Sequence, residues 1–344
     1  MKAARLYGVH DLRVEEMPEP GHPGPGEVLL ELRAVGICGS DIHFFADGSI
    51  GDKALGSPLI LGHEPAGVVI EVGDNVTHLR RGALVAIDPA VPCGYCEWCA
   101  SGHPNLCPQV QFFGSPPTDG ALRERLLHPA ECCFELPEDL TAIDGALCET
   151  LGVGLHAVDL SHLHPGQSVA VIGCGPVGLM TLQVARCAGA TPLIAADLIP
   201  ERLEVARSLG ADLTINATEL PTVAAVMDYT ERRGVDVAFD CATSRETAEQ
   251  CCELVKIGGR VVLCGIPPHD RFSLSHSTAR RKGLTLKFAR RMKHVYPRAI
   301  QLAERGMVEL DTLATHRFPL EQVDQAFQAA ETRRDGVIKA VVEF

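Results

Sequence analysis

Four cysteines lie close together in the first third of the chain. They are Cys93, Cys96, Cys99 and Cys107, and their spacing is C-x2-C-x2-C-x7-C. Short Cys-x2-Cys steps allow a tight loop to turn its thiolates toward one ion, and four thiolates form the closed tetrahedral site of a structural zinc. The loop over residues 93–107 is therefore predicted to bind a structural zinc ion.

Three other kinds of site also use clustered cysteines. An iron–sulfur run often ends in Cys-Pro, as Cys107-Pro108 does, but it expects a three-residue gap where this chain has a longer one. Disulfides would need an oxidising compartment, and the first residues lack the apolar core of a signal peptide. A nucleic-acid zinc module would place basic residues around the ligands, whereas the nearby charge is that of Glu97.

A second group of potential metal ligands is scattered along the sequence. Cys38 comes first, His63 and Glu64 follow some twenty residues later, and Glu149 stands much further on, directly after Cys148. Each residue alone is ordinary, but together they offer a thiolate, an imidazole and one or two carboxylates. A catalytic zinc needs about three protein ligands and one open position. An alcohol oxygen in that position would have a lowered pKa, which prepares its carbon for hydride transfer.

A glycine-rich turn follows the strand-like run 169–172. It reads Gly173-Cys174-Gly175-Pro176-Val177-Gly178 and leads into a helical pattern over 179–188. This is G-x-G-x-x-G with a strand before it and a helix after it, as dinucleotide binding requires. Gly173 permits the tight turn, Gly175 lets the backbone approach a pyrophosphate, and Gly178 allows close helix packing. A turn of this shape that binds nothing is the alternative.

An acidic residue stands where the nucleotide's ribose would lie. Asp197 ends the next strand-like run, about 20 residues after the glycines, and would accept hydrogen bonds from the adenosine ribose. Leu198 follows it, and no arginine stands beside it to neutralise a 2′-phosphate. The sequence therefore favours NAD over NADP.

Composition excludes several classes of protein. The chain has 344 residues and a formal net charge of −13, which argues against nucleic acid or an anionic membrane as its main partner. No apolar run approaches the ~18 residues of a membrane span. Fourteen cysteines, with adjacent pairs such as Cys132-Cys133, are typical of reduced thiols and metal ligands. We expect a cytoplasmic protein.

The texture of the sequence changes near Gly166. Before it, short β-like runs and closely spaced turn residues predict a β-rich domain. After it, apolar strands alternate with helical patterns, which is typical of βαβ units on a parallel sheet. The expected strands there are 168–172, 191–196, 212–215, 235–240, 260–264 and 284–288. A helix near 320–330 and a last strand over 337–344 follow, and the last strand is expected to pair with the first domain.

The chain resembles the zinc-dependent medium-chain alcohol dehydrogenases, and among them the sorbitol, or polyol, dehydrogenase branch. The resemblance covers essentially the whole length. It rests on Ile37-Cys38-Gly39-Ser40-Asp41-Ile42-His43, Gly62-His63-Glu64, the four-cysteine loop and Gly173–Gly178. Two further pieces point to the polyol branch, namely Pro116-Pro117-Thr118-Asp119-Gly120 and Glu149-Thr150-Leu151-Gly152-Val153-Gly154-Leu155-His156.

The resemblance implies an α/β fold with a GroES-like β-rich catalytic domain and a Rossmann domain with a doubly wound parallel sheet. The catalytic domain would comprise 1–151 and 289–344, and the NAD-binding domain 152–288. The active site would lie between the two. Polyol dehydrogenases of this type are commonly tetramers and the superfamily also forms dimers, so a homo-oligomer is expected, with a tetramer favoured over a dimer. The partner of the active site would be a small-molecule alcohol.

The resemblance also implies roles for individual residues. Cys38 and His63 match zinc ligands, Glu64 matches a carboxylate that binds zinc directly or exchanges with water, and Glu149 matches either a direct ligand or a carboxylate that holds the zinc-bound water. Cys148 is the alternative to Glu149 if the alignment slips by one residue. Ser40 and His43 match a proton relay. For the cofactor, Arg202 matches a residue beside the ribose, and Cys264, Gly265 and Ile266 match residues near the nicotinamide.

The substrate pocket departs from the sorbitol dehydrogenase pattern. Two tyrosines of that branch are replaced here by Phe44 and Met292, while the neighbouring Arg291 is retained. A polar group left unpaired in a buried pocket costs about 1–3 kcal/mol. A shorter polyol, a modified sugar alcohol or a simpler secondary alcohol therefore fits as well as sorbitol. Phe112 is a further pocket candidate.

Three functions follow from these observations. The favoured one is NAD-dependent oxidation of a polyol or related secondary alcohol, with two zinc ions per chain, one catalytic and one structural. The second is L-threonine 3-dehydrogenase or another zinc alcohol dehydrogenase branch that acts on a simple secondary alcohol, a diol or a cyclitol. The third is a catalytically silent zinc-binding scaffold, which would require a damaged set of catalytic residues.

Overall fold

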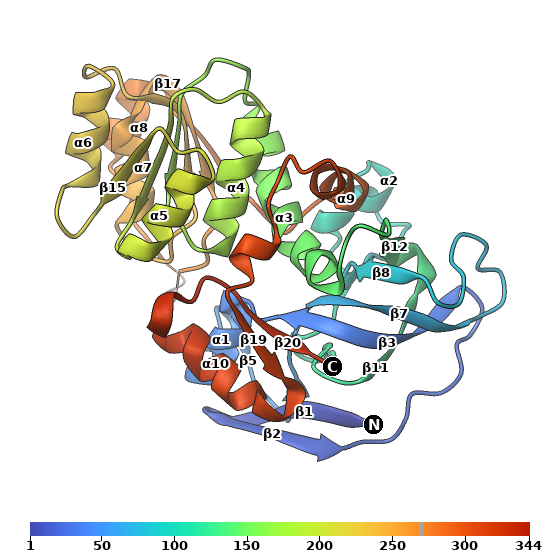
Figure 1. The fold of residues 1–344 in the computed structure, drawn as a ribbon. Coiled ribbons are helices and arrows are strands. Elements are labelled where there is room, and N and C mark those ends of the chain that lie inside the picture. Colours follow the sequence, from blue (N-terminus) through green and yellow to red (C-terminus); the bar gives the residue numbers. More distant parts are fainter. Residues whose placement is uncertain (268–270) are drawn as a thin grey trace. The chain divides into compact units, whose positions relative to one another are not determined.

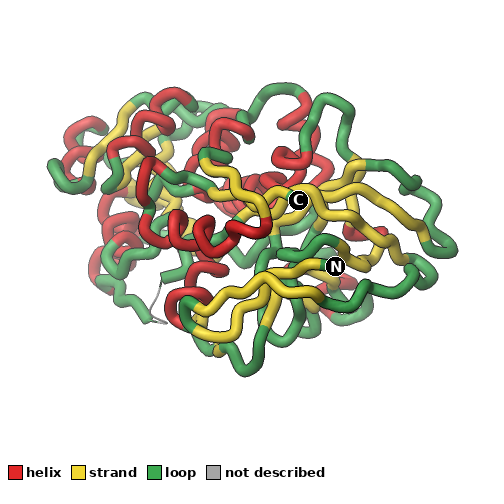
Figure 2. The backbone as a smooth tube through the Cα atoms, turned by 60° about the horizontal axis from the view of Figure 1, so that its bottom comes forward, coloured by secondary structure: helices red, strands yellow, loops and turns green. Residues whose placement is uncertain are grey.

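The computed structural model describes residues 1–267 and 271–344. Within them the chain forms two compact units: unit 1 is Met1–Glu149 with Tyr296–Phe344, and unit 2 is Thr150–Val295. Both chain ends belong to unit 1, where the first strand and the last strand are found (Figures 1 and 2). From the sequence, we expect a catalytic domain of 1–151 with 289–344 and an NAD-binding domain of 152–288. These functional bounds remain a prediction, because the two units are defined by compactness alone.

Unit 1 is built on a seven-stranded sheet in which distant segments of the chain pair. Its order is β12-β8-β7-β3-β20-β19, and β11 pairs with β3 off this path. The bounds are β3 (Glu27–Gly36), β7 (Glu64–Val72), β8 (Leu84–Ile87), β11 (Arg125–Pro129), β12 (Cys133–Glu135), β19 (His316–Pro319) and β20 (Ala340–Glu343). β20 runs antiparallel to β3, so the predicted pairing of the last strand with the first domain is confirmed.

Shorter elements complete unit 1. A three-stranded sheet has the order β2-β1-β6, and β10 pairs with β9 and β4 with β5. Their bounds are β1 (Lys2–Gly8), β2 (Asp11–Glu16), β4 (Ser49–Ile50), β5 (Lys53–Ala54), β6 (Leu59–Ile60), β9 (Ala90–Val91) and β10 (Gln111–Phe112). The helices are α1 (Gly39–Asp47), α2 (Glu97–Ala100), α9 (Tyr296–Glu304) and α10 (Val323–Thr332). The long α3 (Ala142–Ser161) contains the boundary at which unit 2 begins.

Unit 2 is a parallel sheet of six strands in the order β15-β14-β13-β16-β17-β18. This is the strand order of a doubly wound dinucleotide-binding fold, so the predicted α/β fold class is confirmed. The strands are β13 (Val169–Ile172), β14 (Leu193–Asp197), β15 (Leu213–Asn216), β16 (Val235–Asp240), β17 (Val255–Leu263) and β18 (Thr285–Phe288). The helices are α4 (Pro176–Cys187), α5 (Pro200–Ser208), α6 (Thr222–Tyr229), α7 (Thr247–Leu254) and α8 (His276–Lys282).

The central strands of unit 2 are buried throughout their length. Every residue of β13 and of β16 is buried, because helices cover both faces of a parallel sheet. The sequence prediction placed the start of the fifth strand at Arg260, but β17 begins at Val255. The pair Gly258-Gly259 looks like a turn in the sequence, and in the structure Gly258 does take a φ of 71° within an irregular stretch of the strand.

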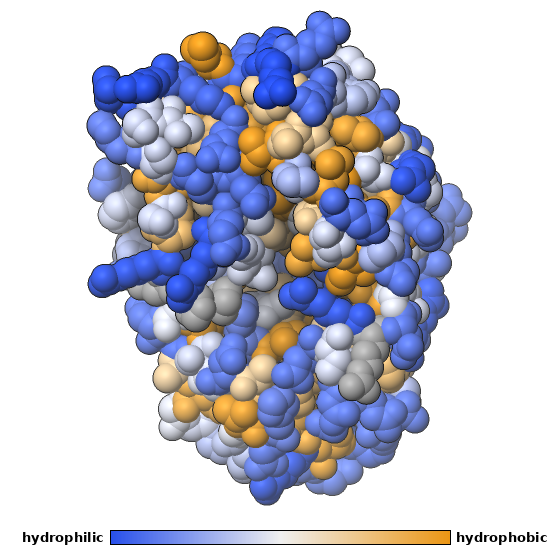
Figure 3. Space-filling model, turned by 90° about the vertical axis from the view of Figure 1, so that its left-hand side faces the viewer, coloured by the Kyte–Doolittle hydropathy of each residue, from blue (hydrophilic) through white to orange (hydrophobic). Residues whose placement is uncertain are grey.

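The surface of the chain carries polar and apolar side chains side by side. On the face drawn in Figure 3, orange hydrophobic side chains lie scattered among blue hydrophilic ones. Among the residues that the structure describes, none of the helices combines the length and the apolar character that a membrane crossing requires.

Candidate active site and metal centres

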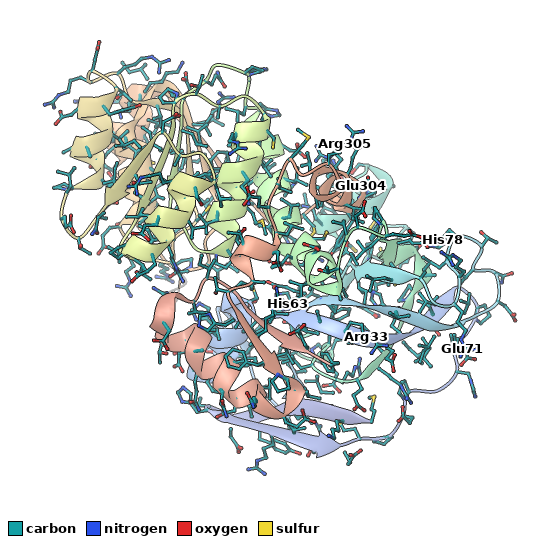
Figure 4. All side chains as sticks on the ribbon, in the orientation of Figure 1. Arg33, His63, Glu71, His78, Glu304 and Arg305 are labelled. Carbon is teal, nitrogen blue, oxygen red and sulfur yellow. The ribbon has the colours of Figure 1, made fainter. Side chains whose placement is uncertain are left out.

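Three potential ligand atoms converge at the end of the large sheet of unit 1. The Cys38 thiol, a ring nitrogen of His63 and a carboxylate oxygen of Glu64 all lie within 4.8 Å of one another. β3 ends at Gly36, whose partner across the ladder is Glu64, the first residue of β7. Cys38 then follows as the N-cap of α1. Strand pairing therefore brings together two segments that are far apart in the sequence, and Figure 4 labels His63 at this place.

Asp41 organises this group, although the sequence analysis gave it no role. Its side chain is 1% exposed; one oxygen accepts a hydrogen bond from the Cys38 amide at 3.0 Å, and the other accepts from the Gly62 amide at 3.2 Å. The second oxygen also lies 3.2 Å from Nδ1 of His63. Because a carboxylate holds Nδ1, Nε2 is the nitrogen presented to a metal. The sequence signal that could have identified Asp41 is an acidic residue three positions after a helix N-cap.

The charges around His63 act strongly on its imidazole. Burial lowers the pKa of His63, but the charges of Asp41 and Cys38 outweigh that effect and hold it well above its ordinary value. Nε2 lies 3.4 Å from the Ser40 hydroxyl. A metal ion would therefore have to displace a proton from this ring, since a histidine ligand must be neutral at the coordinating nitrogen.

Glu64 forms an ion pair with a buried lysine that the sequence analysis also missed. Nζ of Lys339 lies 2.7 Å from Oε1 of Glu64 and 2.6 Å from Oε2, and it donates to the Ile37 carbonyl at 3.1 Å. Burial lowers the pKa of Lys339, but the charges of Glu64 and Cys38 outweigh it and raise the pKa above its ordinary value. No motif in the sequence predicts a role for Lys339, because this residue reaches the site through the pairing of β20 with β3.

Gly36 is required by the position of the Glu64 carboxylate. A Cβ atom built on Gly36 would lie 2.1 Å from Oε2 of Glu64. Real atoms do not approach so closely, so any side chain at this position would displace the carboxylate. A glycine at the end of β3 therefore makes room for Glu64 beside the cysteine and the histidine.

The structure distinguishes Glu149 from its neighbour Cys148. Glu149 is buried in α3 and is not one of the three converging residues, but its negative charge reaches Lys339 and helps to raise the pKa of that lysine. The Cys148 thiol is fully buried, and burial together with the charge of Asp144 raises its pKa to about 12. These surroundings favour the carboxylate over the thiol as the residue that acts on this site.

Ser40 and His43 lie on α1 beside the converging residues. They are three residues apart, so they occupy the same side of the helix. The Ser40 hydroxyl faces Nε2 of His63, and the His43 side chain is 19% exposed with its Nδ1 3.2 Å from a carboxylate oxygen of Asp47. The two side chains therefore lead from the buried histidine toward an exposed carboxylate.

The four-cysteine loop brings its sulfur atoms together as the spacing predicts. The sulfur of Cys99 lies 4.0 Å from that of Cys93 and 3.5 Å from that of Cys96. Four thiolates at about 2.3 Å from a zinc ion would be about 3.8 Å apart, so the loop fits a closed zinc site. Partial burial raises the pKa of Cys93, but the Tyr95 and Cys96 amides outweigh it and lower the pKa to about 7.

The glycine-rich loop of unit 2 joins β13 to α4. Gly173 takes a φ of 95°, and a Cβ on Gly178 would lie 1.8 Å from the Gly173 carbonyl oxygen, so only glycine fits at both places. Gly175 is the N-cap of α4, with Pro176 and Val177 in its first turn. The first amides of the helix are thus free of intrahelical partners, as a phosphate-binding helix start requires.

Asp197 and Arg202 flank this loop. Asp197 ends β14, and its carboxylate accepts from the Cys174 amide at 2.6 Å and from the Leu198 and Ile199 amides at 2.7 and 2.9 Å. A guanidinium nitrogen of Arg202 lies 3.6 Å from the position of a Cβ on Gly175. The acid is therefore fixed at the edge of the loop, and the arginine covers the loop itself.

A cavity opens at the carboxyl ends of β16 and β17. Cys264, Gly265 and Ile266 line it together with Asp240. Burial raises the pKa of Asp240 to about 6. In open α/β sheets, ligands bind outside the carboxyl ends of the strands, so the three residues expected near the nicotinamide lie at such a position.

The residues expected to line the substrate pocket differ in exposure. Phe44 is 2% exposed and belongs to the hydrophobic core of unit 1, and Met292 is 4% exposed and packs beside Gly152 in unit 2. Both side chains are thus buried. Phe112 is partly exposed, and its ring centroid lies 5.2 Å from that of His63. Arg291 has a positive φ of 54°.

Comparison with known proteins identifies the family. Residues 24–138 match the alcohol dehydrogenase GroES-like domain, and residues 176–305 match the zinc-binding dehydrogenase family. The chain is 36% identical to a sorbitol dehydrogenase of Bacillus subtilis, over 99% of this chain and 97% of that protein. It is 35% identical to an L-idonate 5-dehydrogenase of Vitis vinifera, over 95% and 91%.

A solved structure agrees with these matches. A zinc-binding dehydrogenase of Sinorhizobium meliloti bound to NADP superposes with a TM-score of 0.90 at 33% identity, covering 100% of this chain and 99% of that one. The GroES-like part and the Rossmann part expected from the sequence are therefore both confirmed. The chain belongs to the zinc-dependent medium-chain alcohol dehydrogenases, in the branch that resembles sorbitol dehydrogenase, and it is an oxidoreductase.

Proposed function

We propose that this enzyme oxidises the secondary hydroxyl of a polyol or related alcohol to a ketone, with transfer of a hydride to NAD. The observation that carries the proposal is the group formed by the partly exposed Cys38 and the buried His63 and Glu64, whose ligand atoms converge within 4.8 Å. A thiolate, an imidazole and a carboxylate form a donor set suited to a catalytic zinc. We propose one zinc ion there and a second in the four-cysteine loop.

Each residue of the candidate site would have a distinct task. A zinc ion held by Cys38 and His63, with Glu64 or Glu149 completing the site, would supply the Lewis acid that lowers the pKa of an alcohol hydroxyl. Asp41 keeps Nε2 of His63 turned toward the ligand group, because it accepts at Nδ1. Burial of His63 and Glu64 reduces their contact with bulk water, which strengthens the charge interactions between them and their partners.

A path for the alcohol proton follows from the placement of α1. The Ser40 hydroxyl lies next to the buried His63, and the partly exposed His43 lies beside the exposed Asp47. A hydroxyl can accept a proton and pass on another, and an imidazole titrates near neutral pH. We infer that Ser40 takes up the alcohol proton and that His43 delivers it to solvent.

The cofactor proposed is NAD rather than NADP. The Asp197 carboxylate is fixed by three backbone amides at the edge of the glycine-rich loop. A ribose hydroxyl can donate to such a carboxylate, whereas a 2′-phosphate would be repelled by it. The zinc-binding dehydrogenase of Sinorhizobium meliloti binds NADP in its solved structure, so the choice between NAD and NADP needs a direct test in this chain. Initial rates with each cofactor, compared as kcat/KM, decide it, and a higher value with NADP would refute the proposal.

The substrate class is proposed from the relatives and from the site together. Sorbitol and L-idonate dehydrogenases stand among the relatives, so a polyhydroxylated substrate is the first choice. Threonine, a diol or a cyclitol is the alternative, because Phe44 and Met292 offer sorbitol none of the hydroxyls that the two tyrosines of the sorbitol dehydrogenase pattern would provide. The partly exposed Phe112 next to His63 supports an apolar wall at this part of the site.

One experiment tests the proposed function directly. Reduction of NAD would be followed with sorbitol, xylitol, ribitol, butane-2,3-diol, threonine and an inositol-type cyclitol, on protein of measured zinc content. We expect turnover with at least one polyol and its loss after zinc is removed by a chelator. Activity that is restricted to threonine, or that persists without zinc, would contradict the proposal.

We further propose that the enzyme is a cytoplasmic homo-oligomer, with a tetramer favoured over a dimer. β18 is an edge strand of the sheet in unit 2, and Phe288 at its end is 65% exposed. An exposed edge of this kind can pair with its copy across a two-fold axis. All fourteen cysteines are free thiols, as suits a reducing compartment. Light scattering at micromolar concentration would contradict the assembly if it gave the mass of one chain.

A further inference from the structure

The Lys339 ammonium group is buried beside the candidate zinc site of unit 1. It stands directly before β20 and is 2% exposed. The pairing of β20 with β3, continued by a hydrogen bond from the Ile37 amide to the Ala340 carbonyl at 2.9 Å, places it beside the turn that leads to Cys38. A buried charge is costly unless it is paired and hydrogen-bonded, so this position needs an explanation.

All the contacts of the ammonium lead to the candidate zinc site. Nζ lies 2.7 and 2.6 Å from the two oxygens of Glu64 and 3.1 Å from the Ile37 carbonyl oxygen. Glu64 is itself 1% exposed, and its carboxylate fills the space above Gly36. The carboxylate is thus held from two sides, by the glycine that makes room for it and by the lysine that binds both of its oxygens.

The Glu64 carboxylate could either bind a metal ion in this site or stay in its ion pair with Lys339. Its carboxylate lies within 4.8 Å of the Cys38 thiol and of the His63 ring, so it is close enough to act as a third ligand. A carboxylate bound at both oxygens by one ammonium is a weaker donor to a metal ion, because the ammonium withdraws its negative charge. The strength of the ion pair therefore decides how far Glu64 is available to the metal.

We propose that Lys339 is a positioning residue that keeps Glu64 in the ion pair and so leaves one position of a zinc ion in the Cys38 site open to the alcohol. The inference rests on the proposed function, in which that site binds a catalytic zinc. Lys339 touches neither substrate nor cofactor in this role. Its direct contact with the ligand group is with Glu64, and an effect on metal coordination through that carboxylate is separable from a merely structural role for a buried ion pair.

The test compares Lys339→Met with the native enzyme after cobalt(II) is placed in the Cys38 site, with zinc retained in the four-cysteine loop. Cobalt(II) reports its ligands through visible absorption bands, and its affinity is measured by competition with a chelator. We expect Lys339→Met to bind cobalt at least tenfold more tightly and to shift the bands, because the released carboxylate becomes a ligand. kcat should fall more than tenfold while KM changes less.

Two further variants serve as controls. Lys339→Arg keeps a cation opposite Glu64 and should retain the native bands and at least a third of kcat. Lys256→Met removes one of the two cationic partners of Asp236 in unit 2, where Nζ lies 2.6 Å from the carboxylate and Arg233 also pairs with it. This variant tests whether loss of an ion pair far from the Cys38 site in the sequence is enough to change the cobalt bands. We expect the bands to stay unchanged. Native bands and affinity in Lys339→Met, or weaker cobalt binding, would overturn the inference.

Removal of a single partner from a buried ion pair can prevent folding. The double variant Glu64→Gln/Lys339→Met avoids this problem, because it leaves neither charge unpaired, and its reference is Glu64→Gln, whose amide oxygen can still accept from the Lys339 ammonium. If Lys339 acts through Glu64, the two variants should agree in cobalt affinity within threefold and share one spectrum. A larger difference would show that Lys339 acts by another route, and the inference would fail.

Failure of this inference can be told from failure of the proposed function. The cobalt measurements need neither alcohol nor NAD, so they can be read even if the native enzyme oxidises none of the alcohols in the screen. That result would defeat the proposed function alone. An active native enzyme whose Lys339→Met variant keeps native bands would defeat only the role of Lys339.

Discussion

The two units of this enzyme build their candidate sites in different ways. Unit 1 gathers side chains from four separate segments, and the buried Asp41, Glu64 and Lys339 hold the ligand group through charge. Unit 2 builds its nucleotide loop from one continuous segment, in which glycines and backbone amides do most of the work. A site made of backbone depends on local conformation, whereas a site made of side chains depends on the whole sheet.

This difference predicts opposite sensitivities. A substitution in the ligand group of unit 1 should abolish chemistry without changing how unit 2 binds its nucleotide. A substitution at the edge of the nucleotide loop should change cofactor binding without removing zinc. The predictions below test this separation, from the largest expected effect to the smallest.

The largest effect is expected from Cys38→Ala. Loss of the thiolate should release the catalytic zinc and lower kcat/KM by about a thousandfold or more, since a metal Lewis acid contributes several kcal/mol to such a reaction. Metal analysis should fall from two zinc ions to one, while the NAD dissociation constant stays within about twofold. A variant that keeps both ions, or loses NAD affinity, would break the separation between the units.

Cys99→Ala is the matched control for this variant. It removes one thiolate from a closed structural site, so its main effect should be on stability, because metal binding there is coupled to folding. We expect a lower melting temperature and loss of the other zinc ion. If Cys99→Ala left stability unchanged, the four-cysteine loop would not have the structural role assigned to it.

The sequence was sufficient for the sites that are contiguous. The four-cysteine loop and the turn Gly173–Gly178 each lie within a short segment, so their spacing alone predicted the convergence of the sulfur atoms and the tight turn. Cys38, His63 and Glu64 lie in separate segments and were grouped by their residue types and by family resemblance, and the structure brings them together. Lys339 could not be predicted, because it reaches Glu64 through strand pairing between residues 275 positions apart.

The next effect concerns Asp197→Ala in unit 2. A hydrogen bond to a charged group contributes about 1.5–3 kcal/mol, so the variant should bind NAD about ten- to a hundredfold more weakly. The preference for NAD over NADP should narrow, because the charge that repels a 2′-phosphate is gone. Zinc content should stay at two ions per chain. An unchanged cofactor preference would show that Asp197 does not contact the ribose.

Acid should affect the two units in opposite directions. Burial lowers the pKa of His128 in unit 1 to about 4, and its Nε2 donates to the Asp88 carbonyl at 2.8 Å. The unfolded chain therefore binds the proton first, and stability is lost as the pH falls from 6.5 toward 4. Between pH 7 and pH 5 this group should cost about 2 kcal/mol, and His128→Gln should remove that part of the loss.

Asp240 in unit 2 provides the opposite sign. Burial raises its pKa from 3.8 to about 6, so its contribution to stability is complete below pH 3.8 and is lost as the pH rises through 6. Asp240→Asn should therefore stabilise unit 2 more at pH 7 than at pH 4. Denaturant midpoints measured at both values, with zinc content followed, check the pair of variants. Equal pH slopes in His128→Gln and in the native enzyme would contradict the assignment for unit 1.

The smallest effect is expected where the chain departs from the sorbitol dehydrogenase pattern in both units at once. Phe44 of unit 1 and Met292 of unit 2 are both buried, with 2% and 4% of their surface exposed. If they form part of the pocket wall, Phe44→Tyr and Met292→Tyr should raise kcat/KM for sorbitol relative to a simple secondary alcohol. A hydrogen bond contributes about 0.5–1.5 kcal/mol, or about tenfold at most per site.

Packing gives the competing outcome for these two positions. A tyrosine in place of Phe44 would bury a hydroxyl in an apolar core, and an unpaired buried hydroxyl costs about 1–3 kcal/mol. The melting temperature should then fall while the ratio of kcat/KM values for the two alcohols stays unchanged. That result would remove both residues from the pocket, and the substrate would have to be recognised by Phe112, which lies beside His63, and by Arg291.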